Sequence, residues 1–106
     1  MTQLYCDDVG HRVQTIKPNW AKIQNVTVSG TSAPTTNGMP HGCTLAMLIC
    51  TTNSWFKSAT SPTAAKDSTS IYLPAGVYFY LPIAEGEKVA FIQDSAGGTA
   101  QVIPAL

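Results

Sequence analysis

Short runs of apolar residues, alternating or continuous and bounded by turn-forming residues, recur along most of the chain. The C-terminal part holds three of them, residues 77–81, 88–93 and 99–103. The Gly, Pro and Asp residues between them favour turns, because Gly accepts a positive φ and Asp caps a turn. The pattern therefore predicts a meander of three consecutive strands, with Gly97-Gly98 in a hairpin turn.

Two further runs precede this region. Residues 21–29 alternate as a strand does, with Val26 and Val28 on one face and Asn25 and Thr27 on the other. Residues 44–51 form the most apolar run of the chain and are apolar on both faces, which predicts a central strand buried on both sides.

The segments between these runs are polar. Residues 30–42 show no apolar period and predict a long loop, which either carries an interaction or is flexible filler. A further short strand begins at Trp55, and residues 58–70 form a polar connection. The sequences Tyr72-Leu73-Pro74 and Tyr80-Leu81-Pro82 predict two strands that each end at Pro, because Pro cannot donate to a ladder.

The N-terminal part lacks a sustained period. We expect an N-terminal arm over residues 1–20, with one short strand near residues 11–16, and a single domain over residues 21–106. Trp20 at the base of the arm is a candidate interface residue, as an anchor for a partner, although it could equally plug the core.

About eight short strands with Gly and Pro turns, and no convincing helix, predict an all-β fold. Such chains form two packed sheets or a barrel. The length of 106 residues suits one domain, which should hide roughly 65% of the surface of the unfolded chain. We therefore expect one two-sheet β-sandwich of antiparallel strands.

Charged residues make up only 11% of the chain, where about 25% is typical, and the formal net charge is +0. Charge normally keeps β-rich surfaces from associating. The composition thus favours a subunit covered by partners over an ordinary monomer with a Ser/Thr surface. The six Lys and Arg residues are scattered, so we expect no nucleic-acid partner. No signal peptide or membrane-spanning run is evident, and synthesis in a cytoplasm is expected.

Motifs for catalysis or phosphate binding are not found in the sequence, and we expect neither an enzyme nor a cofactor. Cys6, Cys43 and Cys50 cannot all pair within one chain, and reduced, buried thiols are expected. His41 with Cys43, and Cys6 with His11, are the only plausible soft-metal ligands. Neither pair has the spacing of a metal motif, so we expect no metal site.

Tyr78 and Tyr80 share one face of the run 77–81, and Phe79 lies on the other. If Phe79 faces the core, the two tyrosines line an outer surface suited to a protein partner or a sugar ring. The alternative is a strand buried on both sides. Tyr78 and Tyr80 are therefore candidate interface residues together with Trp20.

Residues 54–103 resemble small virion proteins of tailed bacteriophages. The most specific segment is KVAFIQDSAGGT at residues 88–99, supported by YLPAG at residues 72–76. The group includes capsid decoration or cement proteins with β-sandwich or jelly-roll folds.

The resemblance implies a non-enzymatic virion subunit without a cofactor. It would be made in the host cytoplasm, form a dimer or trimer, and bind the major capsid protein or another virion protein. The alternatives are a tail-fibre or spike module that binds a host surface glycan and, less in keeping with the motifs, a small hydrolase.

Overall fold

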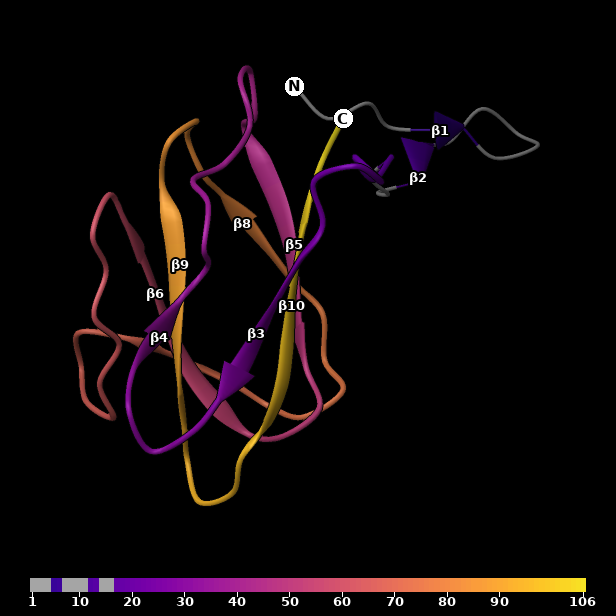
Figure 1. The fold of residues 1–106 in the computed structure, drawn as a ribbon. Helices are drawn as coiled ribbons and strands as arrows, with labels where there is room; N and C mark the ends of the chain where they lie inside the picture. The colour runs from indigo at the N-terminus through magenta and orange to yellow at the C-terminus, as the bar shows by residue number, and fades with distance from the viewer. Residues whose placement is uncertain (1–4, 7–11, 14–16) are drawn as a thin grey trace.

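The computed structural model describes residues 5–6, 12–13 and 17–106 of the chain. Over these residues the chain forms strands and no helix, so the predicted all-β class is confirmed. Eight strands make two four-stranded antiparallel sheets, whose layers face each other in Figure 1. This arrangement is consistent with a β-sandwich. The described residues include no helix with the length and apolar character needed to cross a membrane.

The strand bounds follow the sheet order. The first sheet contains β3 (Gln24–Val28), β10 (Gly98–Pro104), β5 (Leu45–Cys50) and β8 (Phe79–Pro82). The second sheet contains β4 (Ala33–Pro34), β9 (Lys88–Gln93), β6 (Ser54–Ala59) and β7 (Ile71–Leu73). A separate two-stranded sheet pairs β1 (Tyr5–Cys6) with β2 (Arg12–Val13).

The pairing of the eight strands is nested. β6 pairs with β7, β5 with β8, β4 with β9, and β3 with β10, all antiparallel. The first four strands and the last four therefore form one antiparallel ribbon, which turns back at the β6–β7 connection. Two further pairings, β10 with β5 and β9 with β6, close the folded ribbon into the two sheets.

The predicted meander is wrong. β8 and β10 belong to the first sheet, where β5 lies between them, and β9 belongs to the second sheet. The segment containing Gly97 and Gly98 crosses between the sheets and is not a hairpin turn. Glycine is needed there because of close approach: a Cβ on Gly98 would lie 2.5 Å from Thr51 Oγ1, and one on Gly97 would lie 2.9 Å from the Val28 carbonyl oxygen.

Several turn predictions are confirmed. The Val77 N–H donates to the Pro74 carbonyl oxygen at 3.3 Å, and Gly76 has a φ of 76°. Gly86 likewise has a φ of 82° in the turn between β8 and β9. The two Pro-terminated strands are also as predicted, since β7 ends just before Pro74 and β8 ends at Pro82.

The prediction of a long loop over residues 30–42 is wrong in part. This segment contains the short strand β4, and Met39 within it is 4% exposed and belongs to the core. The Met39 N–H donates to the Glu87 carbonyl oxygen at 2.8 Å, and the Gly86 N–H donates to the Met39 carbonyl oxygen at 3.0 Å. A strand of two residues is too short to give a periodic signal in the sequence.

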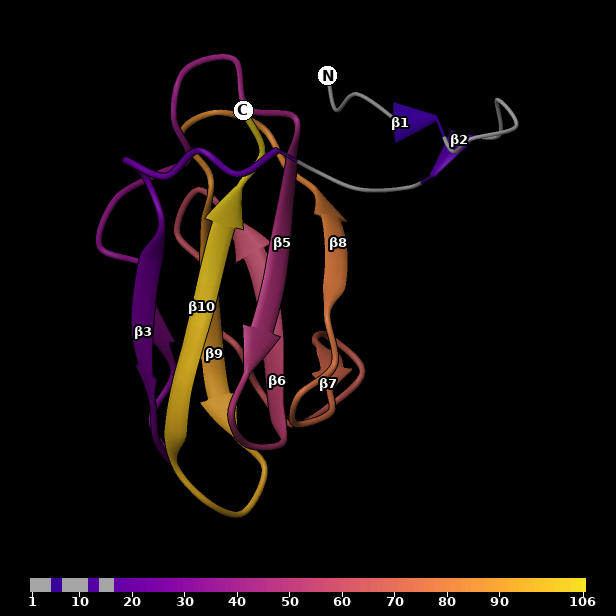
Figure 2. The same ribbon diagram turned by 90° about the vertical axis from the view of Figure 1, so that its right-hand side faces the viewer.

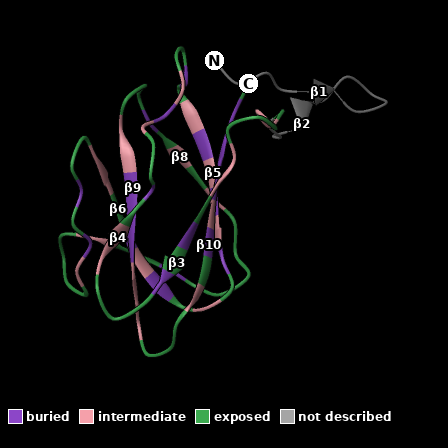
Figure 3. Cartoon of the chain, viewed as in Figure 1, coloured by how far each residue is buried: buried purple, intermediate pink, exposed green. Residues whose placement is uncertain are grey.

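Aromatic packing joins the two sheets. The Phe56 ring on β6 meets the Phe79 ring on β8 edge to face, with centroids 5.1 Å apart, and lies 6.1 Å from the Phe91 ring on β9. Aliphatic residues from the inner faces of both sheets surround these rings. Figure 3 shows buried residues along the strands and exposed residues over most of the connections. The buried aliphatic members include Val26, Val28, Leu48, Leu73, Val89 and Val102.

Residues 44–51 form the central strand that the sequence predicts, since β5 lies between β10 and β8. Burial is complete on one face only. Ala46, Leu48 and Cys50 are buried, whereas Leu45, Met47 and Ile49 are half-buried at the outer face.

Residues just before β3 pair with the C-terminal end of the chain. Pro18 forms a bridge with Ala105, and the Asn19 N–H donates to the Pro104 carbonyl oxygen at 2.8 Å. Part of the predicted 1–20 arm is thus hydrogen-bonded to the end of β10. The predicted strand at residues 11–16 is represented by β2, and its other residues lie outside those described. The arm and its boundary with the domain 21–106 stay predictions.

Cys43 and Cys50 are both buried and free, as the sequence predicts, whereas the side chain of Cys6 lies outside the described part. Cys43 precedes β5 and donates its thiol proton to the Leu45 carbonyl oxygen at 3.4 Å. Burial raises the pKa of the Cys43 thiol above its ordinary value.

Removing one of two buried side-chain hydroxyl groups should lower the free energy of unfolding, and removing the other should not. Thr35 Oγ1 accepts a hydrogen bond from the Val89 N–H at 3.3 Å, whereas Ser54 Oγ has no partner within the described residues. We expect Thr35→Val to lower the free energy of unfolding by about 1–3 kcal/mol, because it leaves a buried donor unpaired. Ser54→Ala should leave it unchanged or raise it by about 1 kcal/mol. Urea denaturation measures both, and a larger loss for Ser54→Ala than for Thr35→Val would contradict this account.

The Cys43 thiol should make stability fall at alkaline pH. Its pKa is higher in the folded than in the unfolded chain, so its contribution is fully present below the unfolded pKa of about 8.5 and is lost as pH rises through the folded pKa. We expect the free energy of unfolding to fall less between about pH 8 and about pH 10 in Cys43→Ala than in the wild type. Denaturation series at the two pH values measure this, and an equal fall in both proteins would rule it out.

Candidate functional site: the outer face of the first sheet

The four strands of the first sheet contain no charged residue. The second sheet differs, since β6 contains Lys57 and β9 contains Lys88. Successive side chains on a strand point to opposite sides, so the neighbours of the buried residues point outward. We call this outward surface the charge-free face. It comprises Asn25, Thr27, Leu45, Met47, Ile49, Tyr80, Pro82, Thr99, Gln101 and Ile103.

One end of this face is apolar. Met47 on β5 lies between Ile103 on β10 and Tyr80 on β8, and Leu45 lies opposite Pro82. Leu45 and Met47 are half-buried, and Tyr80 is 37% exposed. We call these five residues the apolar end. Ile103 is only 8% exposed, so the surface open to a partner is that of Leu45, Met47, Tyr80 and Pro82, and covering it removes water from no charge.

The opposite end of the face carries amide and hydroxyl groups. Gln101 on β10 lies between Asn25 on β3 and Ile49 on β5. This row borders a shallow hollow of about 280 Å³, which we call the amide groove. The Gly76 N–H donates to the Cys50 carbonyl oxygen at 2.9 Å and fixes one rim of the groove. Its lining residues are Asn25, Ile49, Cys50, Thr51, Gly76, Thr99 and Gln101.

The outer face of the second sheet is partly covered by the chain itself. The connection between β6 and β7 lies outside that sheet in Figure 1, and Ala64 within it is 3% exposed. The Ala64 N–H donates to Ser32 Oγ at 2.9 Å, and Lys66 Nζ donates to the Asp94 carbonyl oxygen at 2.9 Å. Ala90, which points outward from β9, is fully buried. In Figure 2 the first sheet lies in front, and of the described chain only the segment around residues 17–22 crosses it, at its upper end.

The structure places the predicted interface residues at the surface. Trp20 is 78% exposed, so the alternative that it plugs the core is wrong. Phe79 packs against the core while Tyr78 and Tyr80 are 53% and 37% exposed. The alternative of a strand buried on both sides is therefore wrong as well. Whether these residues form an interface stays a prediction.

These three residues are not equally placed. Tyr80 belongs to the apolar end, Tyr78 comes just before β8, and Trp20 follows Asn19 at the Pro104 end of β10. Sequence reasoning missed Met47, whose outward orientation depends on the pairing of β5 with β10 and β8. The absence of charged residues from four strand segments was a signal that could have pointed to this face.

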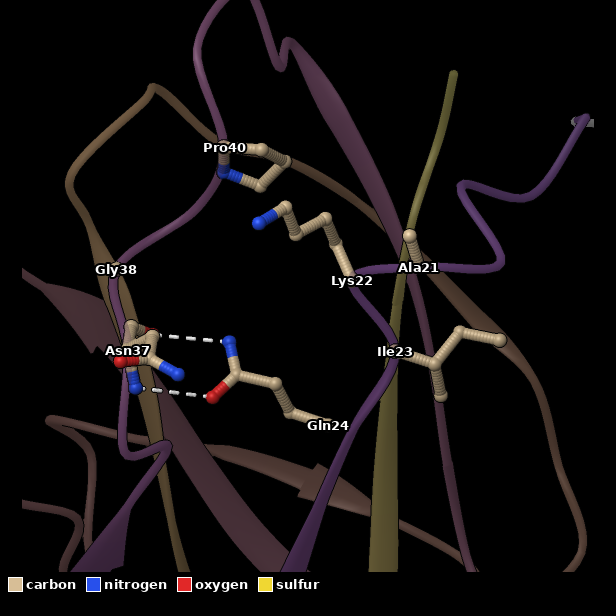
Figure 4. Close-up of a pocket in the computed structure, with 7 residues that line it drawn as sticks. All are labelled: Ala21, Lys22, Ile23, Gln24, Asn37, Gly38 and Pro40. Carbon is tan, nitrogen blue, oxygen red and sulfur yellow. Dashed lines mark hydrogen bonds between the residues drawn. The ribbon is translucent and has the colours of Figure 1, made fainter.

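A second hollow lies beside the start of β3 and is shown in Figure 4. Its volume is about 200 Å³, and Lys22 is the only charged residue that lines it within the described part of the chain. The Gln24 side chain donates to the Asn37 carbonyl oxygen and accepts from the Asn37 N–H, both at 2.9 Å. Gly38 has no room for a side chain, since a Cβ would lie 2.6 Å from the Gly86 carbonyl oxygen. This arrangement holds the 35–43 segment against β3 and has a structural role.

The residues considered as metal ligands do not form a site in the described chain. His41 is exposed and its Nδ1 lies 3.0 Å from Glu85 Oε2, within hydrogen-bond distance, whereas Cys43 is buried in the core. His11 and the Cys6 side chain lie outside the described residues. Among those described, no group of three or more His, Cys, Asp or Glu side chains is placed to hold a metal ion.

Comparison with known proteins adds no relative to these observations. No protein-family model, no curated protein and no solved structure matches the chain.

Proposed function

We propose that the chain is a non-enzymatic structural protein of a tailed-bacteriophage virion, a capsid decoration or cement subunit that stabilises the head shell. The observation that carries the proposal is the charge-free face with its apolar end. A sheet of four strands without one charge, in a chain that places its Lys, Arg, Asp and Glu residues elsewhere, suits a surface that is covered in an assembly. The resemblance of residues 54–103 to small virion proteins supports the same class.

The finer fold that we propose is a jelly roll. The nested pairing of β3–β6 with β7–β10 supports it, because a jelly roll is an antiparallel ribbon wrapped into two sheets of four strands each. Jelly rolls occur in viral capsid proteins and also in lectins. The fold is therefore compatible with the proposed function without implying it.

We propose that the apolar end and Trp20 contact the major capsid protein or another virion protein. Tyr and Trp side chains bury about 150–250 Å² each in interfaces, and burial contributes about 25 cal/mol per Å² of apolar surface. No buried charge would need a counter-charge, so little of this energy is lost to desolvation. The arm over residues 1–20 would extend the contact, with Trp20 as the anchor at its base. The partners would include neither nucleic acid nor a membrane.

The low charge also supports association between copies, and we expect a dimer or trimer on the particle. The protein would be synthesised in the host cytoplasm and located in the virion. A second candidate function is a tail-fibre or spike module that binds a host surface glycan. The amide groove favours that candidate, because neutral amide and hydroxyl groups suit a sugar better than a protein shell.

Two matched tyrosines test the attachment surface. Tyr80 on the first sheet and Tyr72 on the second are 37% and 40% exposed, and Tyr72 also meets the Trp55 ring edge to face with centroids 5.3 Å apart, so replacement by Glu should perturb the folded domain at least as much at Tyr72 as at Tyr80. We expect Tyr80→Glu to reduce binding to shells that lack the protein at least tenfold, since about 1.4 kcal/mol of unpaired-charge desolvation suffices for that factor. Tyr72→Glu should bind like the wild type. Co-sedimentation with purified shells measures the bound fraction.

Trp20→Ala is the second variant tested for shell binding. Trp20 is mostly exposed, so its removal should leave thermal stability unchanged while reducing shell binding. Thermal melts of all three variants check that each one folds. The proposal fails if Tyr80→Glu and Trp20→Ala fold and bind as the wild type does, or if Tyr72→Glu weakens binding equally.

A further inference from the structure

The amide groove presents side-chain amides that are not used to hold the fold. Asn25 and Gln101 lie opposite each other on β3 and β10 and both point outward. Within the described residues, neither amide makes a side-chain hydrogen bond to the protein. The Gln24 and Asn53 amides differ, because Gln24 bonds the Asn37 backbone and Asn53 Oδ1 accepts from the Ala75 N–H at 2.9 Å. Most of the exposed lining of the groove is apolar, so the two amides can supply only a few hydrogen bonds to a ligand that lies there.

Each amide offers one acceptor oxygen and two donor hydrogens in a fixed plane. A ligand that displaces their water must replace those hydrogen bonds, or each unpaired group costs about 1–3 kcal/mol. Groups that both donate and accept, such as the hydroxyls of a sugar, meet this requirement in any orientation. The Thr99 side chain adds a hydroxyl to the same rim.

The groove also has an apolar contact surface. Ile49 lies directly beside Gln101 and is half-buried at the outer face. A pyranose ring has C–H groups on its faces and hydroxyls around its edge. An apolar side chain flanked by amides matches that distribution, as in ligand pockets that are largely apolar with a few placed polar groups.

Charge and size narrow the ligand class. Among the described residues no charged one lines the groove, so a carboxylate or phosphate would lose water without gaining a counter-charge from them. Its volume of about 280 Å³ lies just below the range of about 300–1,000 Å³ that is usual for ligand pockets. These values suit a single ring better than an extended chain.

We propose that the amide groove, through Asn25, Gln101 and Ile49, is a binding site for a neutral pyranose sugar. The groove lies at the Thr99 end of β10, and the apolar end of the face lies toward Pro104. The two surfaces can thus be occupied at the same time. The inference rests on the second candidate function, glycan binding, for which it names the site and the ligand class. It goes beyond the attachment function, and each of these two can fail without the other.

The test is a nuclear magnetic resonance titration of the full ¹⁵N-labelled chain. The probes are the methyl glycosides of glucose, galactose, mannose and N-acetylglucosamine, with glucuronic acid and N-acetylneuraminic acid as charged comparisons. We expect at least one neutral glycoside to shift the Asn25 and Gln101 side-chain amide signals and the Ile49 backbone signal to saturation. The charged sugars should bind more weakly than that glycoside.

Variants locate the site. Asn25→Ala and Gln101→Ala should each weaken binding by about tenfold, because each removes hydrogen bonds to the ligand. Thr27→Ala is the matched control, since Thr27 points outward from the same strand as Asn25 but does not line the groove. Signal dispersion in each spectrum shows that the variant is folded, and the wild-type shift map tests the site without any variant.

Three results would overturn the proposal. The first is that no neutral glycoside shifts the groove signals of the folded wild type. The second is that a charged sugar binds more tightly than every neutral one. The third is that Thr27→Ala weakens binding as much as the two groove variants do. Shell binding by the same preparations is measured separately, so a failure here leaves the attachment function to its own test.

Discussion

The packing of two inner faces around Phe56 is the constraint on which the rest of the structure depends. Phe56 contacts Phe79 from the opposite sheet and Phe91 from its own, and aliphatic residues of both sheets close around the three rings. Because successive side chains on a strand point to opposite faces, the residues before and after each core residue point outward. Burying Leu48 therefore places Met47 and Ile49 on the charge-free face. The surface proposed for function is a consequence of the core and of the residues that alternate with it.

The nested pairing makes the two outer faces unequal. The innermost strands, β6 and β7, are joined by a connection that lies outside the second sheet and is tied to it by Ala64 and Lys66. The first sheet contains the outermost pair, β3 and β10, and has no comparable connection among the described residues. The sheet that the chain covers less is also the sheet without charge, although the segment around residues 17–22 crosses its upper end in Figure 2 and Ile103 there is 8% exposed. These two properties together, rather than the exposure of a single aromatic residue, motivate the proposal of a binding surface.

Local chemistry predicted most of the strands but not their partners. Alternation located β3, runs of apolar residues between turn-forming residues located β5 and β9, and the turns at Gly76 and Gly86 follow from glycine's tolerance of positive φ. The meander failed because a turn signal does not show whether the next strand joins the same sheet or the facing one. Long-range strand pairing decides this. The sequence reflects that pairing at Gly98, where a side chain would collide with Thr51.

The candidate site, like the fold, could be predicted only in part from the sequence. The exposure of Tyr78 and Tyr80 follows from the burial of Phe79, which alternation alone could anticipate. The amide groove could not be anticipated, because Asn25, Gln101 and Ile49 come from three segments that only the register of β3, β10 and β5 brings side by side. β4 was missed because two residues give no period.

Cryo-electron microscopy of a phage particle that contains the chain would test the proposal that the charge-free face attaches the subunit to a virion shell. The account predicts density for the sandwich at symmetry-related positions on the head, with the apolar end and Trp20 against the major capsid protein. Density for the chain at the tail alone, or on the head with this face turned to solvent, would contradict it.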